Sequence, residues 1–321
     1  MQYFDILKRA WKITWGYKAL WIFGILVALV SGGGGSGSGG GNSGAQGNWS
    51  QHGGWERVPH IPTGLIIWMI VLLLILLFLF FIASTLARYV GENALIKMVD
   101  DYEETERCYT LPEGFRLAWS PAAARLFLLD LIVRIPLAML VLGYLLLIGA
   151  PLLLWFADST AAGIVGTLFS GGLFLAGLPL FFIIGGLVTW LQHFFRRVCV
   201  LADVGVFAAL QGGATLVFQH FNEVFWMGLL MWGVNLLGGL GVLLVVLCLF
   251  LLAMIVGGLP ALLVGGLATV FFKGAFAWVL GGLAFLPSFF ALVIFPSLLL
   301  RGICETFKST VWTLVYRELN Q

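Results

Sequence analysis

The stretch GLIIWMIVLLLILLFLFFIASTLAR, residues 64–88, decides the fold of this chain. It carries no charge before Arg88, and it exceeds the ~20 apolar residues that an α-helix needs to cross a bilayer. It belongs to an apolar run at about 61–88, and five further runs occupy about 17–31, 122–156, 163–195, 224–256 and 275–300. The six runs predict an all-α, polytopic membrane protein whose helices form a bundle.

The composition of the 321 residues agrees with this prediction. Hydrophobic residues make up 61% of the chain and charged residues only 10%, whereas soluble domains carry about 25% charged residues. The net charge of +2 is dispersed, and a nucleic-acid surface requires a clustered basic stripe. We therefore expect membrane lipids as partners and exclude nucleic acid.

The basic residues are sorted onto one side of the apolar runs. Of the 17 lysines and arginines, only Arg57 and Lys273 fall in the opposite set of connections. Short loops rich in Lys and Arg stay in the cytoplasm. The sorting therefore predicts that both termini are cytoplasmic and that the number of crossings is even.

Two apolar segments need separate interpretation. The run Ala19–Val30 follows a basic stretch, as in a signal peptide, but the long aromatic segment before it favours a retained first crossing. Its ~18 Å of helix requires Lys18 to snorkel. The segment 257–273 is interrupted by glycines and by Pro260. We expect it to be a re-entrant excursion, since a full crossing would place the basic C-terminal segment outside.

An internal repeat divides the chain. A motif of four residues occurs twice, and its two copies are 108 residues apart. The first copy is Asp5, Lys8, Ala10 and Trp11, and the second is Glu113, Arg116, Ala118 and Trp119. A weaker third copy begins near Asp203 and Ala208. We predict a single membrane domain, 1–321, made of three repeat units at about 1–110, 111–203 and 204–321. Each unit consists of a surface helix followed by a hairpin of two crossings.

The surface helices are expected to be amphipathic and to lie on the inner leaflet. In the first, Phe4, Leu7 and Trp11 share one face, and Lys8 and Lys12 share another. The segment 302–319 has the same pattern. Basic residues there gain ~1 kcal/mol each from anionic headgroups. The candidate headgroup contacts are Lys8, Lys12, Arg116, Lys308 and Arg317. A structural anchor is favoured over a specific lipid sensor.

Polar groups inside the apolar runs are the usual indication of a functional site in a membrane protein. The candidates are Asp130, Arg134 and Asn235. Asp130 and Arg134 are four residues apart and can pair along one helix face. We favour a structural ion pair over a substrate or proton site. For Asn235, a hydrogen bond between helices is the ordinary explanation.

Residues 31–58 are predicted to form a flexible, extracytoplasmic loop, because 12 of the 24 positions from 31 to 54 are glycine. Two motifs in this region are interpreted as chance patterns, the GxGxxG of Gly39, Gly41 and Gly44 and the spacing of His52, Glu56 and His60. The first lacks the flanking strand and helix, and Gly53 and Pro59 oppose the helix that the second requires. No metal or cofactor is therefore expected.

The chain also lacks the motifs of known catalytic sites, including a Ser-His-Asp set, HExxH and a phosphate-binding loop. We therefore expect a protein that is not an enzyme.

One resemblance spans most of the chain. It is carried by Ala10 and Trp11, by the sequence KALW at 18–21, and by the closing VWTLVYREL at 311–319. These residues resemble a broad group of uncharacterised bacterial integral membrane proteins. That group looks like the membrane domain fused to some glycerophosphodiester phosphodiesterases, without their catalytic domain. The resemblance implies a six-helix bundle in a bacterial inner membrane.

Three functions remain open at this stage. The first is a non-enzymatic scaffold or regulator that oligomerises or organises lipid. The second is a transporter or permeability factor for a lipid-like or small amphipathic molecule, which would need a roomy cavity near the midplane of the bilayer. The third is an auxiliary subunit of a larger membrane complex. The expected partners are lipids and either a second copy of the chain or another membrane protein.

Overall fold

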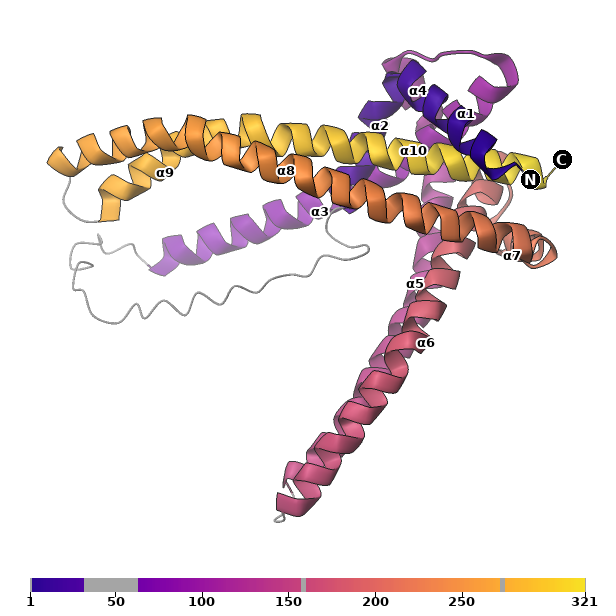
Figure 1. Cartoon of the computed structure of the whole chain (residues 1–321), viewed down its shortest axis with the longest axis horizontal. Helices are drawn as coiled ribbons and strands as arrows, with labels where there is room; N and C mark the ends of the chain where they lie inside the picture. The colour runs from indigo at the N-terminus through magenta and orange to yellow at the C-terminus, as the bar shows by residue number, and fades with distance from the viewer. Residues whose placement is uncertain (1, 32–62, 157–159, 272–274, 321) are drawn as a thin grey trace. The chain divides into compact units, whose positions relative to one another are not determined.

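The computed structural model describes residues 2–31, 63–156, 160–271 and 275–320, and every regular element among them is a helix (Figure 1). The all-α prediction is confirmed. The predicted glycine-rich loop from residue 32 onward, its two motifs, Arg57 and Lys273 lie outside the described residues.

The elements follow one another as short and long helices. The first group is α1 (Tyr3–Gly16), α2 (Ala19–Ser31) and α3 (Thr63–Thr105). The second is α4 (Leu111–Ala118), α5 (Pro121–Gly149) with the 3₁₀ turn η1 (Ala150–Phe156), and α6 (Thr160–Leu201). The third is α7 (Val206–Gln219), α8 (Phe221–Phe271), α9 (Ala275–Phe289), the π-helical turn η2 (Phe290–Ile294) and α10 (Phe295–Leu319).

Five stretches of helix among the described residues are long and apolar enough to cross a membrane. They are Ile67–Thr105, Pro121–Phe156, Thr160–Leu201, Phe221–Val270 and Trp278–Leu319. The helices α1 and α2 reach that length only as a pair, and they are joined at a bend of 101°. The sixth crossing and the even count therefore remain predictions.

The expected re-entrant excursion at 257–273 is not present in the described part of this segment. Residues 257–271 continue α8, which is a single helix of 51 residues. A helix satisfies its own backbone hydrogen bonds, which an apolar environment demands. Gly257 of this segment lies instead at a close helix contact. A Cβ on Gly257 would lie 2.8 Å from Ser288 Cβ, and one on Gly281 would lie 2.8 Å from the carbonyl oxygen of Ala261. Close contact between α8 and α9 therefore requires small residues.

The segment 302–319 also differs from expectation, because it continues α10 and does not form a separate surface helix. The apolar side chains assigned to lipid contact are buried in protein, with Val311, Leu314 and Val315 at most 2% exposed. The amphipathic pattern was real, but the core of the protein covers its apolar face.

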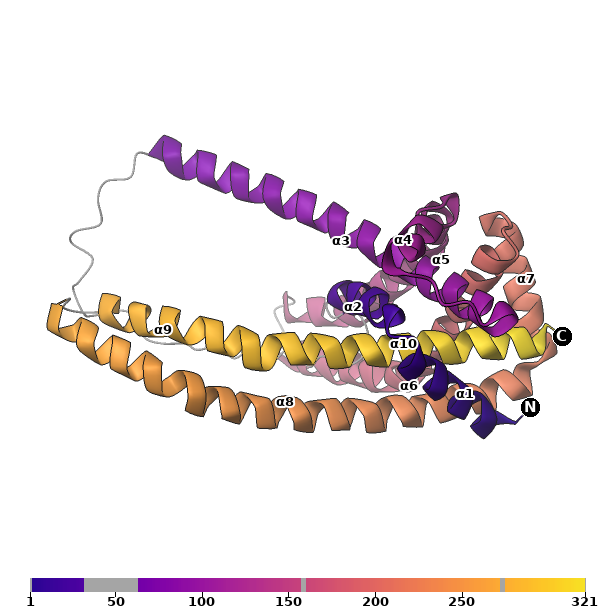
Figure 2. The same ribbon diagram turned by 90° about the horizontal axis from the view of Figure 1, so that it is seen from above.

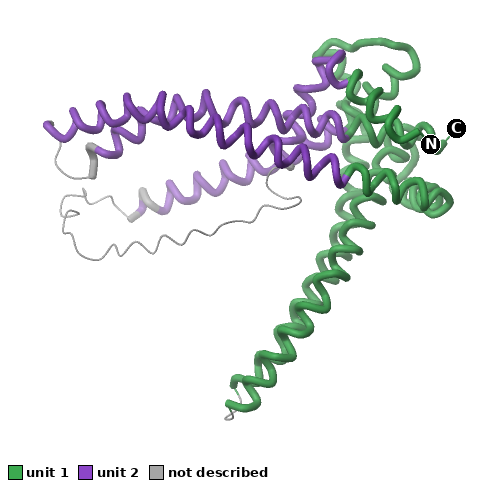
Figure 3. Tube along the Cα trace, in the orientation of Figure 1, with its two compact units in different colours: residues 1–13, 93–231, 309–321 green, residues 14–92, 232–308 purple. Residues whose placement is uncertain are grey.

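The chain forms two compact units, coloured separately in Figure 3. Unit 1 comprises residues 1–13, 93–231 and 309–321, and unit 2 comprises residues 14–92 and 232–308. In both, the most apolar 18-residue windows of the membrane-length helices are at most 6% buried. Burial is concentrated where these helices meet the short ones.

In unit 1, α5 and α6 form an antiparallel hairpin, and Figures 1 and 2 show the two helices together. The Tyr144 hydroxyl donates a hydrogen bond to the carbonyl of Leu173 at 2.5 Å, and Ser170 Oγ donates to that of Ile148 at 2.8 Å. The helix α4 begins with a capping interaction in which the Thr110 N–H donates to Glu113 Oε2 at 2.9 Å. This backbone hydrogen bond lowers the pKa of Glu113.

In unit 2, α2 packs against both α3 and α10. A Cβ on Gly91 of α3 would lie 3.1 Å from Val27 Cγ2, and the Thr306 hydroxyl of α10 donates to the carbonyl of Leu20 at 3.1 Å. The helix α2 is only 13 residues long, or ~20 Å. Its contacts with α3 and α10 bury one face of this short helix.

Candidate functional site

An ionic centre lies in unit 1 around Asp130 of α5, whose exposure is 1%. Arg196 of α6 donates from Nη2 to Oδ1 at 2.7 Å and to Oδ2 at 2.8 Å, and from Nε to Oδ1 at 3.1 Å. Arg134 lies one helical turn further along α5, with Nη2 3.3 Å from Oδ2. The predicted contact between Asp130 and Arg134 is confirmed. The stronger partner, Arg196, was missed.

The neighbouring Arg197 joins α6 to the C-terminal half of α10. It is 2% exposed, and it donates to the carbonyl of His193 at 2.6 Å and to that of Ser309 at 2.9 Å. The His193 ring stacks on Trp312, with 5.0 Å between the centroids. Arg196 and Arg197 are among the basic residues whose sorting predicts the topology, and in the structure both side chains hold helices together. Their contacts favour a structural role for this centre.

The third intramembrane candidate, Asn235, is exposed on α8 in unit 2, whereas Asp130 and Arg134 belong to unit 1. The five candidate headgroup residues fall into two classes. Lys8, Lys12 and Arg116 are exposed. Lys308 lies 3.1 Å from Glu305 in unit 2, and Arg317 Nη1 lies 2.8 Å from Asp100 Oδ1 in unit 1.

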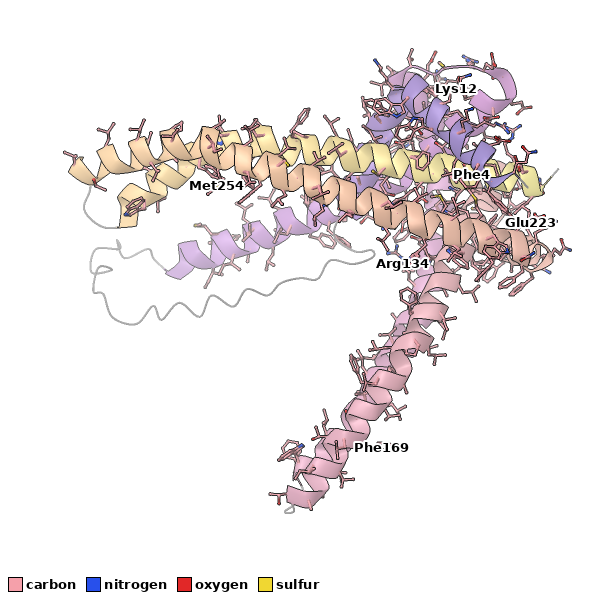
Figure 4. The ribbon with its side chains drawn as sticks, viewed as in Figure 1. Phe4, Lys12, Arg134, Phe169, Glu223 and Met254 are labelled. Carbon is pink, nitrogen blue, oxygen red and sulfur yellow. The ribbon has the colours of Figure 1, made fainter. Side chains whose placement is uncertain are left out.

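Within unit 1, α1 presents different chemistry on its different faces. Ile6 and Ala10 point into the protein and are at most 1% exposed. The aromatic side chains that we assigned to lipid point outward, with Phe4 81% and Trp11 54% exposed. Figure 4 labels Phe4 and Lys12 on this helix. The sequence identified the aromatic and the cationic faces, but not the buried one.

A cavity of about 850 Å³, which we call the basic cavity, opens along α1. Its lining residues are Gln2, Asp5, Lys8, Arg9, Trp11, Lys12 and Glu318. Neither Lys8 nor Lys12 forms an ion pair with any residue that the structure describes. The cavity therefore offers two cationic groups beside an indole ring.

A second cavity of about 620 Å³, the acidic cavity, is lined by polar groups from four helices of unit 1. Its lining includes Arg9, Glu103, His220, Glu223, Arg317 and Glu318, with Leu314 and Leu319. Figure 4 labels Glu223 near the beginning of α8. The two cavities share Arg9 and Glu318 and are therefore adjacent.

Arg9 links the walls of both cavities. Its Nη2 lies 2.5 Å from Glu103 Oε2, and its Nη1 lies 3.8 Å from Glu318 Oε1. Arg317 is neutralised in the same way by Asp100. In contrast, Glu223 makes no ion pair within the described parts of the chain. Both guanidinium groups are thus paired, whereas the carboxylate of Glu223 is not paired with any described residue.

Metal chemistry receives no support from this arrangement. Among the residues that the structure describes, no group of three or more His, Cys, Asp or Glu side chains is placed to hold a metal ion.

Comparison with known proteins identifies the family but no activity. No curated protein and no solved structure was found to match the chain. Residues 15–320 match a family described as a family of unknown function, DUF7544. Since this match covers nearly the whole chain, the protein belongs to that family.

Proposed function

We propose that this protein is a non-enzymatic scaffold or regulator of a bacterial inner membrane, which organises lipid through the basic cavity of α1. Its apolar helices provide the membrane anchor. The single observation that carries the proposal is the basic cavity itself, where Lys8 and Lys12 lie beside Trp11. Cationic side chains attract phospholipid phosphate, and exposed aromatic rings favour the boundary between headgroups and acyl chains.

The proposal includes the predicted topology of six crossings in three hairpin repeats, with both termini in the cytoplasm. The order of the helices supports it, because the short helices α1, α4 and α7 are each followed by apolar helices that include at least one of membrane length. The resemblance to the membrane domains of some glycerophosphodiester phosphodiesterases belongs to the same proposal. It adds a bacterial location and no catalytic role.

A role as a subunit of a larger membrane complex is the second candidate. The observation that favours it is the low burial of the apolar helices, at most 6% in their most apolar windows. Transport is less well supported. The basic cavity is lined mainly by the short helix α1, and the acidic cavity mainly by residues near the ends of long helices, whereas a transporter binds its substrate near the midplane.

Native mass spectrometry tests the lipid proposal. The full chain is reconstituted with equal amounts of phosphatidylglycerol and phosphatidylcholine, extracted mildly, and the retained lipids are counted. We expect preferential retention of phosphatidylglycerol. The double variant Lys8→Gln/Lys12→Gln should reduce that preference by up to about 30-fold, since each basic residue contributes ~1 kcal/mol.

The matched control is Arg107→Gln/Arg301→Gln, which removes the same charge at two exposed positions outside the basic cavity. It should retain the preference of the original protein. Equal retention of the two lipids by the original protein, or equal losses in the two double variants, would show that the basic cavity does not select lipid.

A further inference from the structure

The basic and acidic cavities differ in charge although they are adjacent. The ionisable lining of the basic cavity consists of three cations, Lys8, Arg9 and Lys12, and two carboxylates. The acidic cavity carries three carboxylates, Glu103, Glu223 and Glu318, against two guanidinium groups that already have acidic partners. A ligand that spans both cavities would therefore place an anionic group in the basic cavity and a cationic group in the acidic cavity.

We propose that the two cavities together bind a phospholipid whose headgroup carries a primary ammonium, with its phosphate at Lys8 and Lys12 and its ammonium at Glu223 and Glu318. This inference rests on the proposed lipid-organising function and names the class of lipid. The ethanolamine headgroup carries both groups, since a short ethylene link joins its phosphate to its ammonium.

The shared wall explains how one headgroup contacts both cavities. Arg9 lies between Glu103 and Glu318, so its charge is compensated and does not repel a nearby ammonium. Glu318 lines both cavities and lies where the phosphate-binding and ammonium-binding groups meet. The exposed rings of Phe4, outside the cavities, and of Trp11, in the wall of the basic cavity, give the acyl chains an apolar surface.

The chemistry of the acidic cavity favours a primary ammonium over a quaternary one. An ammonium group has three N–H donors, and it can donate to the carboxylates of Glu223 and Glu318. The choline group carries a positive charge but no N–H donor. Hydrogen bonds to charged groups are among the stronger contributors to binding, and their loss reduces affinity on the order of tenfold.

The test measures lipid retention by native mass spectrometry, with the full chain reconstituted in three separate mixtures. Each mixture contains phosphatidylcholine and an equal amount of phosphatidylethanolamine, N,N-dimethylphosphatidylethanolamine or phosphatidylglycerol. We expect phosphatidylethanolamine to be retained about tenfold over phosphatidylcholine, with a smaller ratio for the dimethylated lipid. Glu223→Gln should bring the phosphatidylethanolamine ratio close to one and leave the phosphatidylglycerol ratio unchanged.

The control variant is Glu104→Gln, which removes a carboxylate at an exposed position of α3 outside both cavities. It should bind like the original protein. Thermal unfolding of both variants verifies the fold, and we expect Glu223→Gln to have the same melting temperature as the original protein.

Different outcomes overturn different claims. A phosphatidylethanolamine ratio near one beside a high phosphatidylglycerol ratio overturns the ammonium site and leaves the lipid scaffold standing. A phosphatidylglycerol ratio near one overturns the scaffold proposal itself. If phosphatidylethanolamine is preferred but Glu223→Gln has no effect, or if N-methylation does not reduce retention, the assignment to the acidic cavity is wrong.

Discussion

At the scale of single residues, the contact between Asp130 and Arg196 is the most demanding interaction in unit 1. Two largely buried charges leave water only when hydrogen bonds compensate their lost hydration. Here Arg196 uses Nε and Nη2 on one carboxylate, in the multiple-bond geometry typical of strong arginine–carboxylate pairs. Arg134 is 48% exposed and lies further away. The two arginines are therefore not equivalent partners.

This asymmetry gives a prediction for Asp130→Asn. The substitution leaves the charge of Arg196 buried without its counter-ion, and breaking a buried pair costs about 3–5 kcal/mol. We expect a loss of this size in the apparent free energy of unfolding, measured by titrating sodium dodecyl sulfate into dodecyl maltoside micelles.

Two further variants complete that experiment. Arg134→Gln should cost at most about 1 kcal/mol, because the exposed ion pair that it removes is weak. The double variant Asp130→Leu/Arg196→Met should recover most of the stability, since apolar residues can replace a buried ion pair at little cost. Equal losses for Asp130→Asn and Arg134→Gln would contradict the assignment of Arg196 as the main partner.

At the scale of helices, the packing of α2 in unit 2 depends on the absence of side chains. A Cβ on Gly24 would collide with the Thr306 hydroxyl and with the carbonyl of Gly302. Conversely, a Cβ on Gly302 would lie 2.9 Å from the backbone nitrogen of Ile25. Small residues let apolar helices approach closely enough for such backbone contacts. The short helix α2 is thus held by glycine packing and by the hydrogen bond from Thr306.

We therefore expect Gly24→Ala to destabilise unit 2 by about 1–3 kcal/mol, the usual cost of an extra methyl group in a tightly packed core. The measurement is the shift in melting temperature in detergent. The control is Gly258→Ala in α8, where a Cβ would meet nothing within 4 Å. Equal melting temperatures for the two alanine variants would contradict the close approach of α2 and α10.

At the scale of the whole molecule, the apolar helices and the packed core are largely separate features. The apolar windows are at most 6% buried, while the best-buried residues include Leu95, Leu129, Phe194 and Val315, near the polar ends of their helices in unit 1. Lipid or another protein must therefore cover the apolar lengths. In the proposed function, the membrane anchors the protein and the polar residues of the two cavities bind lipid.

The predicted topology is testable by cysteine labelling in intact cells. In a variant without native cysteines, Asn320→Cys should react with a membrane-impermeant maleimide only after permeabilisation, because the basic C-terminal segment is predicted to be cytoplasmic. Ser36→Cys, in the predicted external loop, should react without permeabilisation and serves as the positive control. Labelling of Asn320→Cys from outside would contradict the cytoplasmic assignment of the C-terminus.

The sequence by itself determined the helical class and the helices of membrane length. Apolar runs of ~20 residues have few alternatives to a helix in hydrocarbon, where each backbone polar group needs a partner within the segment. Local spacing also indicated the ion pair of Asp130 and Arg134 and the exposed cationic face with Lys8 and Lys12. These features depend on residues within one or two helical turns, and a single sequence records them directly.

Only the tertiary structure decided which residues meet across distant segments. Asp130 binds Arg196, 66 positions away, and Arg9 binds Glu103, 94 positions away. Helical periodicity carries no information about such contacts, because it fixes a side chain's face and not its neighbour. The same limit led us to assign 302–319 to the membrane surface. An apolar helix face satisfies the hydrophobic effect equally well against lipid or protein, and the packing of this chain covers it with protein.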